Sequence, residues 1–182
     1  MSTAIFNADS AILLWIQDTL RAAWLNPLVI GITHLGDTGA LWILVALVLL
    51  AFKQTRKLGL VCALSMIIGL AVTNLVIKNW VARVRPYELV DGLERIIGAQ
   101  HDWSFPSGHS TNSFACAWVL FRKAPRRYGV PALVLAILIA LSRLYVGVHY
   151  PTDVLGGTVI GIASAVIAMV VASRVEARRA KA

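Results

Sequence analysis

Long apolar blocks are the feature of this sequence that most constrains its fold. They cover, approximately, residues 39–52, 58–77, 110–121, 129–146 and 154–173. A helix needs about 20 apolar residues to cross the roughly 30 Å hydrocarbon core of a bilayer, and these blocks approach or meet that length. Hydrophobic residues fill 58% of the 182 positions, more than a soluble domain of this size contains. The sequence therefore predicts an all-α integral membrane protein, a single domain over residues 1–182.

The N-terminal part of the chain has a more polar pattern. Residues 9–25 combine Trp15 and Trp24 with the charged Asp18, which is typical of an amphipathic helix at the membrane interface. A short apolar run follows over residues 26–37, so that a broken span and two separate elements both fit this region. The first apolar block has no basic start and no small-residue cleavage site, which argues against a cleaved signal peptide.

The basic residues predict the orientation of the helices. Eleven of the 17 lysines and arginines lie in two connections and near the C-terminal end: Lys53, Arg56, Lys57, Arg122, Lys123, Arg126, Arg127, Arg174, Arg178, Arg179 and Lys181. If successive spans alternate in direction, all of these residues lie on one side of the membrane. Cytoplasmic loops carry an excess of basic residues, so we expect that side to be the cytoplasm. The net charge of +8 is thus explained by topology, and we expect no nucleic-acid partner. We expect the C-terminus in the cytoplasm and residues 78–109 and 147–153 on the opposite side.

A first polar cluster follows the block that ends near residue 77. Lys78 and Arg85 are seven positions apart, two helical turns, so that both point the same way before Pro86 stops the helix. Two cations on one face can clamp an anion. The alternative is that long basic side chains extend to the membrane interface, an interpretation that fits Lys78 taken alone and that we keep for Arg83.

A second cluster, Pro106-Ser107-Gly108-His109, leads from a polar loop into an apolar helix. Ser107 can cap that helix, and the first backbone N–H groups of a helix lack intrahelical acceptors, so the junction is suited to bind phosphate oxygens. His109 would be a proton donor or acceptor there. The alternative is a capped, hydrated histidine without a catalytic role.

A third cluster runs from Ser142 to Asp153. Arg143 lies near the end of an apolar block, where a charged residue is costly and invites a functional interpretation. Pro151 can start the next helix, which places Asp153 in its first turn, within reach of His149. A carboxylate on one imidazole nitrogen fixes the tautomer and raises the basicity of the other nitrogen, as a nucleophilic histidine requires. A purely structural hydrogen bond between the two side chains is the alternative.

Taken together, the three clusters resemble the tripartite signature of the type 2 phosphatidic acid phosphatase superfamily, which spans residues 78–153 here. The resemblance implies a bundle of about six transmembrane helices and metal-independent hydrolysis through a phosphohistidine, with no cofactor. His149 would attack phosphorus, Asp153 would orient it, and His109 would protonate the leaving oxygen and then activate water. The resemblance also implies a set of groups that hold the phosphate oxygens: Lys78, Arg85, Ser107, Gly108 and Arg143.

The favoured function is a lipid phosphatase of a bacterial inner membrane that acts on undecaprenyl pyrophosphate at the extracytoplasmic face. Phosphatidylglycerophosphate, phosphatidic acid and lipid A phosphates are alternative substrates, and a phosphotransferase would use the same residues. A vanadate-dependent haloperoxidase would reuse the same pocket, but those relatives are soluble and longer. From a different class, the chain could be a non-catalytic membrane scaffold, or a small transporter in which Lys78, Arg143 and Asp153 form a proton or ion path. The charged loop from Glu88 to Asp102 would shape head-group choice or be merely solvated.

Overall fold

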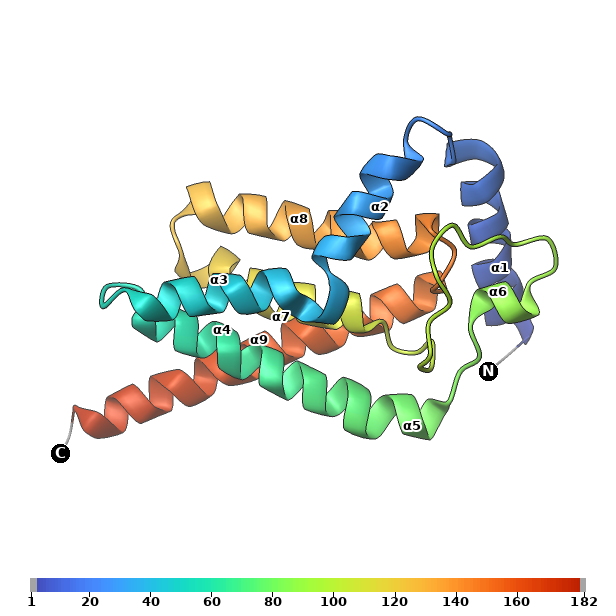
Figure 1. The fold of residues 1–182 in the computed structure, drawn as a ribbon. Helices are drawn as coiled ribbons and strands as arrows, with labels where there is room; N and C mark the ends of the chain where they lie inside the picture. The colour runs from blue at the N-terminus through green and yellow to red at the C-terminus, as the bar shows by residue number, and fades with distance from the viewer. Residues whose placement is uncertain (1–2, 181–182) are drawn as a thin grey trace.

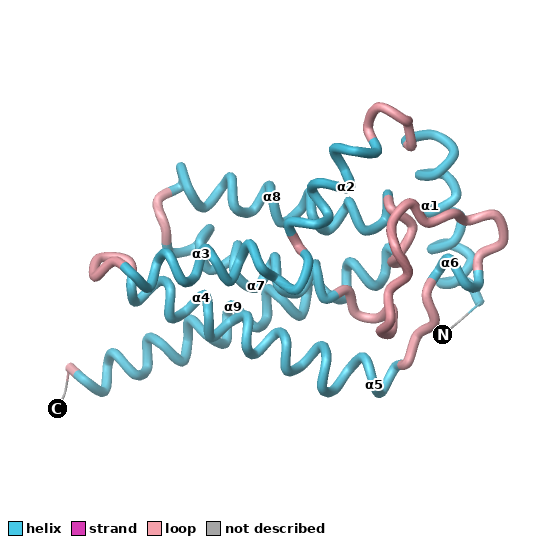
Figure 2. Tube along the Cα trace, viewed as in Figure 1, coloured by secondary structure: helices cyan, strands magenta, loops and turns pink. Residues whose placement is uncertain are grey.

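The structure is a computed structural model that describes residues 3–180, so Lys181 lies outside the described part of the chain. All regular secondary structure within these residues is helical (Figures 1 and 2). The elements are α1 (Thr3–Leu20), α2 (Asn26–Leu35), η1 (Asp37–Gly39), α3 (Ala40–Ala51), α4 (Arg56–Leu70), the π-helix η2 (Ala71–Ile77), α5 (Lys78–Val81), α6 (Pro86–Leu89), α7 (Gly108–Lys123), α8 (Arg126–Tyr145) and α9 (Pro151–Arg179). The all-α prediction is confirmed, and each apolar block forms a helix.

Helix α7 is the centre of the bundle and is packed by α4, α8 and α9. Its small residues allow the close packing, since Ala115, Cys116 and Ala117 are fully buried. Glycines on α9 add to it: a Cβ at Gly157 would lie 2.4 Å from the Ser107 carbonyl oxygen, and one at Gly161 would lie 2.5 Å from the Thr111 carbonyl oxygen. Such small residues let helix backbones approach in a membrane, where packing rather than burial from water drives association.

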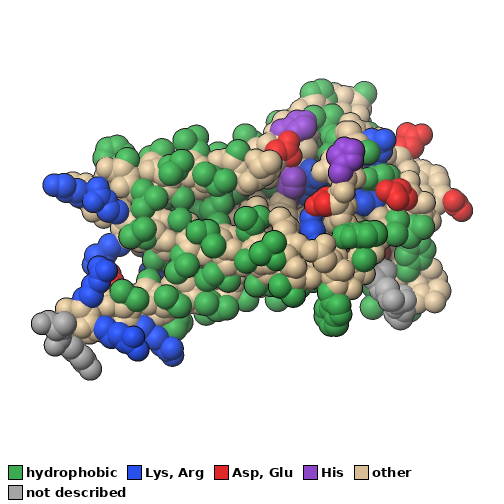
Figure 3. All heavy atoms as spheres, turned by 60° about the horizontal axis from the view of Figure 1, so that its bottom comes forward, with side chains coloured by type: hydrophobic (Ala, Val, Ile, Leu, Met, Phe, Trp, Pro, Cys, Tyr) green, Lys and Arg blue, Asp and Glu red, His purple; other side chains and the backbone are tan. Residues whose placement is uncertain are grey.

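The exterior of the bundle is apolar. Three helical segments within residues 3–180 are long and apolar enough to cross a membrane, Arg56–Leu89, Arg126–Tyr145 and Pro151–Arg179, and the pair α2 and η1–α3, bent by 43°, would be a fourth. Figure 3 shows apolar side chains over the middle of the molecule, lysines and arginines at one end, and histidines and acidic residues toward the other. The membrane-protein prediction is supported, and the number of about six spans stays a prediction.

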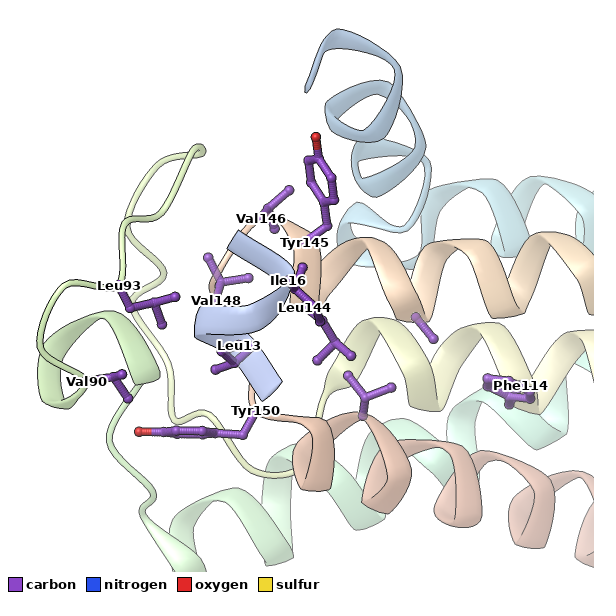
Figure 4. Close-up of a cluster of buried hydrophobic side chains, with 12 residues drawn as sticks. Leu13, Ile16, Val90, Leu93, Phe114, Leu144, Tyr145, Val146, Val148 and Tyr150 are labelled. Atoms are coloured by element: carbon purple, nitrogen blue, oxygen red, sulfur yellow. The ribbon is translucent and has the colours of Figure 1, made fainter. Parts of the chain in front are cut away.

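The N-terminal region forms two separate helices, α1 and α2, which decides between the two alternatives left open by the sequence. Leu13 and Ile16 on α1 are buried in an apolar cluster with Val148 and Tyr150 from the loop after α8 (Figure 4). Trp24, in the turn between the helices, is 78% exposed, as an interfacial residue would be. Helix α1 therefore covers the loop that carries His149.

The first polar cluster does not lie on one continuous helix, so the prediction that Pro86 stops the helix is wrong. Helix α5 ends at Val81, and Ala82 takes a left-handed backbone conformation (φ 44°) that turns the chain away. Arg85 is extended and caps α6, in which Pro86 is the first residue. This is the position that proline favours, because its missing N–H is not needed there.

Candidate active site

The three polar clusters meet at one end of the bundle, where α7 and α9 begin and α5 and α8 end (Figure 1). The contacts that join them are made between elements far apart in the sequence. The Ser107 amide donates to the Asp153 carbonyl oxygen over 3.0 Å, which links the second and third clusters. Arg85 contacts His149, which links the first and the third. The fold therefore brings together the residues that the sequence singled out.

His149 is 2% exposed, and both of its ring nitrogens face a partner. Its Nδ1 lies 3.4 Å from Asp153 Oδ2, and its Nε2 lies 3.2 Å from the Arg85 guanidinium. A guanidinium has only donors, so Nε2 is the unprotonated nitrogen and Nδ1 carries the hydrogen toward Asp153. Burial lowers the pKa of the imidazole to about 3. The charges of Arg85 and Arg143 also lower this pKa, whereas Asp153 raises it. His149 is therefore a neutral imidazole with its lone pair on Nε2.

Asp153 is fully buried and anchors His149 to the rest of the site. Its Oδ2 accepts hydrogen bonds from the Ser104 hydroxyl (2.5 Å) and from the Tyr150 amide (2.9 Å), in addition to its contact with the imidazole. Its Oδ1 accepts from Arg83. A carboxylate with this many donors stays ionised and has one orientation, which in turn fixes the plane of the imidazole.

Arg83 corrects the sequence interpretation. We expected its side chain at the membrane interface, but it is only 8% exposed and bridges two buried carboxylates. One guanidinium nitrogen lies 2.5 Å from Asp153 Oδ1 and the other lies 2.7 Å from Asp9 Oδ2. Asp9 in turn accepts from the Thr152 hydroxyl and amide. Spacing along the chain gave no signal for this network, because Asp9 is 144 positions from Asp153.

Lys78 and Arg85 converge on the carboxylate of Asp102. The Lys78 ammonium donates to Asp102 Oδ2 and the Arg85 guanidinium donates to Oδ1 over 2.5 Å, while Arg85 Nε donates to the Asp102 backbone carbonyl. Burial alone would raise the pKa of the Asp102 carboxyl, but the two cations outweigh it and hold the pKa below its usual value. Both cations are nearly buried and the Asp102 side chain is 54% exposed. An exposed carboxylate therefore sits on two buried cations, an arrangement that the sequence did not reveal.

Ser107 and Gly108 form the start of α7. Ser107 is the N-cap, and its hydroxyl accepts from the Ser110 amide at 3.4 Å. A Cβ on Gly108 would lie 3.9 Å from the Lys78 ammonium, so this helix start adjoins the cations. The partial positive charge of a helix N-terminus adds to theirs, and an anion at this position would be held by both.

Arg143 comes from the last turn of α8 and is 1% exposed. Its NH1 donates to the Thr33 hydroxyl over 2.7 Å and its NH2 to Gln100 Oε1 over 3.4 Å. The third nitrogen, Nε, is buried and has no hydrogen-bond partner within residues 3–180. A buried guanidinium with an unused donor is suited to hold an additional acceptor such as a phosphate oxygen.

His109 lies in the first turn of α7, and its Nε2 lies 2.9 Å from Asp37 Oδ1. Burial lowers the pKa of the His109 imidazole to about 4, with Arg143 adding to the effect and Asp37 opposing it. The charges of Arg143 and Arg85 act on His109 as they do on His149, so both histidines adjoin the same cations. The sequence did not single out Asp37, and its only signal was a carboxylate at the end of an apolar run.

A metal site is not formed by the described part of the chain. No group of three or more His, Cys, Asp or Glu side chains within residues 3–180 is arranged to hold a metal ion. The cluster instead offers cations, backbone amides and two histidines. Such groups can bind a phosphate and transfer it, since phosphoryl transfer depends on positioning and on stabilising charge.

The family model described as the PAP2 superfamily matches residues 56–176, which include all three clusters. The chain belongs to this superfamily, as its resemblance to the type 2 phosphatidic acid phosphatases led us to expect. A phosphatidylglycerophosphatase B of Bacillus subtilis is 34% identical over 175 residues, 88% of this chain and 81% of the relative. An undecaprenyl-diphosphatase of Sulfolobus acidocaldarius is 33% identical over 141 residues, 78% and 68% of the two chains. The chain is accordingly an enzyme of the phosphatase class.

Solved structures share the fold. A transmembrane PAP2-type phosphatidylglycerolphosphate phosphatase from Bacillus subtilis superposes with a TM-score of 0.77 at 29% identity, over 95% of this chain and 88% of that one. Aquifex aeolicus LpxE superposes with the same TM-score at 24% identity, over 87% and 93% of the two chains, and this likeness concerns the fold alone. The arrangement of α1–α9 is thus that of a PAP2 membrane protein.

Proposed function

We propose that the protein hydrolyses a terminal phosphate of a membrane lipid through a phosphohistidine on His149. The observation that carries this proposal is the state of His149, a buried neutral imidazole with Nδ1 directed at Asp153 and Nε2 directed at Arg85. Such a nitrogen is a nucleophile, and the cations around it would hold the phosphate that it attacks. Lys78, Arg85 and Arg143, with the Ser107 hydroxyl and the Gly108 amide, would be the phosphate-binding groups.

In the first step the Nε2 lone pair of His149 attacks phosphorus, and the bond from phosphorus to the leaving oxygen breaks. His109 gives its proton to that oxygen, so the leaving group departs as a lipid alcohol from a monoester or as a lipid monophosphate from a diphosphate. Asp153 accepts the Nδ1 hydrogen bond throughout and stabilises the positive charge that develops on the imidazole.

In the second step His109, now neutral, accepts a proton from a water molecule whose oxygen attacks phosphorus. The bond between Nε2 and phosphorus breaks, inorganic phosphate forms and His149 returns to its starting state. No cofactor or metal is needed for either step, because the cations of the chain neutralise the phosphoryl charge.

An apolar cleft supports a lipid substrate. It has a volume of about 240 Å³ and lies between α3 and α4, with Leu47 and Leu70 among its lining residues. It reaches Thr38, which follows Asp37 in the chain, and Asn112, which lies three positions after His109. The leaving oxygen carries the lipid and takes its proton from His109, so a lipid tail in this cleft would fit the proposed role of His109.

Among lipid phosphates we favour undecaprenyl pyrophosphate, with phosphatidylglycerophosphate, phosphatidic acid and a lipid A phosphate as alternatives. The names of the two relatives, an undecaprenyl-diphosphatase and a phosphatidylglycerophosphatase, support the first two. We place the protein in a bacterial inner membrane with about six helices in the bilayer, as a single domain. The gathering of basic residues at the opposite end of the bundle supports a cytoplasmic C-terminus and an extracytoplasmic site (Figure 3).

The test is phosphate release by the purified protein in detergent with EDTA, for undecaprenyl pyrophosphate, phosphatidylglycerophosphate and phosphatidic acid, with His149→Ala alongside. We expect release that survives EDTA, is abolished by His149→Ala and is fastest with undecaprenyl pyrophosphate. Release from no lipid, or release unaffected by the substitution, would contradict the proposal and favour a scaffold or a transporter. Phosphate that appears on an added lipid alcohol instead of in water would identify a phosphotransferase.

A further inference from the structure

His109 has a partner that lies outside residues 56–176, the part of the chain that the family model matches. The family match begins at residue 56, and the carboxylate that contacts His109 belongs to Asp37, in the short helix η1 between α2 and α3. We propose that Asp37 is a positioning residue for His109. Its carboxylate holds the imidazole in one tautomer and favours the protonated form, which donates a proton to the leaving oxygen. This inference rests on the proposed function, because it assigns a partner to the acid and base of that reaction.

The hydrogen bonds define which nitrogen of His109 meets the substrate. A carboxylate only accepts, so His109 Nε2, 2.9 Å from Asp37 Oδ1, carries a hydrogen toward it. The other oxygen of Asp37 lies 2.7 Å from Nδ1 of His34 in α2, which holds the carboxylate from its far side. His109 Nδ1 is thereby left as the nitrogen that exchanges a proton with the leaving oxygen and with water. The chain of contacts runs from His34 through Asp37 to His109.

The backbone between α2 and α3 is shaped to deliver this contact. A Cβ at Gly36 would lie 2.6 Å from Cδ2 of the His109 ring and 2.7 Å from the Ile139 side chain, so only glycine lets the ring occupy this position. Thr38 and Gly39 follow with positive φ angles of 53° and 73°, and the helices on either side are bent by 43°. A threonine in the left-handed region is uncommon, and such conformations concentrate where a site needs a particular geometry. The bend thus turns the Asp37 carboxylate toward α7.

The charges around His109 explain why the reaction needs this carboxylate. Arg143 from α8 and Arg85 from the loop before α6 both disfavour a proton on His109, and burial adds to their effect. Lys78 of α5 lies beside the neighbouring Gly108. Asp37 is the carboxylate that opposes these cations at His109, since the nearby Asp102 is paired with Lys78 and Arg85. Without it, the pKa of His109 would fall further below its usual value, and a smaller fraction of His109 would carry the proton that the leaving oxygen needs.

The experiment compares the pH dependence of kcat for Asp37→Asn and wild type, with Asp91→Asn, an exposed loop carboxylate, as the matched control. Loss of the carboxylate lowers the pKa of His109, so both limbs of the profile should move to lower pH, by about one unit, which is about tenfold in rate on the alkaline limb. Asp37→Glu, which keeps a carboxylate, should restore part of the wild-type profile. The loss should also be smaller with p-nitrophenyl phosphate, because its leaving group departs without a proton.

A second pair of variants tests the geometry without changing a charge. Gly36→Ala puts a methyl group against the His109 ring, whereas Gly31→Ala, five positions earlier and within α2, meets nothing within 4 Å. We expect about a tenfold or larger loss of kcat for the first and wild-type kcat for the second. Each variant is checked for a wild-type melting temperature.

The results separate the inference from the function on which it rests. A lower rate in Asp37→Asn with an unmoved pH profile would show a merely structural role and overturn the inference. Wild-type behaviour of both Asp37→Asn and Gly36→Ala, while His149→Ala is inactive, would also overturn it and leave the phosphatase proposal standing. Full activity of His149→Ala would remove the proposed function itself.

Discussion

The site contains two histidine–aspartate pairs in very different surroundings. The pair of His149 and Asp153 is in the interior, with side chains 2% and 0% exposed, and Arg83 and Ser104 hold the carboxylate in addition. The pair of His109 and Asp37 is at the edge, with side chains 14% and 50% exposed. A nucleophile benefits from a rigid, neutral imidazole, whereas an acid and base must exchange protons with water. The difference in burial therefore matches the difference between the two proposed roles.

The largest expected effect is at the interior pair. Asp153→Asn keeps the shape of the side chain but removes the charge that holds the Nδ1–H tautomer, so kcat should fall by about 10³- to 10⁴-fold, against about tenfold for Asp37→Asn near neutral pH. Steady-state phosphate release at saturating substrate measures both. The control is Asp91→Asn. Equal losses for Asp153→Asn and Asp37→Asn would break the distinction between the two pairs.

The free energy of unfolding should also depend more on the interior pair and its Arg83 than on the pair at the edge. Arg83→Met leaves Asp9 and Asp153 as buried carboxylates without their shared cation, which should cost about 3–5 kcal/mol of unfolding free energy. Asp37→Asn removes a half-exposed contact and should cost about 1 kcal/mol or less. Thermal unfolding in detergent compares the two, with Arg174→Met, an exposed position on α9, as the control for Arg83. A melting temperature for Arg83→Met equal to that of the control would contradict the buried network.

The smallest effect is expected at Asp102, whose carboxylate occupies the cations that we assign to the phosphate. An entering phosphate has to displace it, so Asp102→Asn should tighten inhibition by inorganic phosphate several-fold, with a smaller change in kcat. Competition assays over a series of phosphate concentrations measure this. Weaker phosphate inhibition in the variant would indicate that Asp102 helps to hold the substrate instead of competing with it.

Much of this molecule could be predicted from local patterns. Each apolar block became a helix, and the Pro106–His109 motif marked the beginning of α7 with Ser107 as its cap. The four-residue spacing of His149 and Asp153 indicated their hydrogen bond. These features depend on residues that are close together in the sequence, so sequence patterns can predict them.

Other features were missed or misread because they depend on distant segments. Arg83 was expected at the membrane interface, yet it lies between Asp9 and Asp153 in the interior. The helix was expected to continue to Pro86, yet the chain turns at Ala82. Neither outcome has a local signature, since a basic side chain near the end of an apolar block occurs at an interface and in a buried network alike.

The sequence by itself determined the helices, the membrane class and the residue types of the three polar clusters, because hydrophobic length, capping and short spacings are properties of contiguous residues. Only the tertiary structure decided the other carboxylate partners: Asp153 for Arg83, Asp37 for His109, and Asp102 for Lys78 and Arg85. The physical reason is that charge pairing acts through space. A buried charge takes whichever partner the packing of α1, the segment between α2 and α3, and the loop before α7 brings within reach.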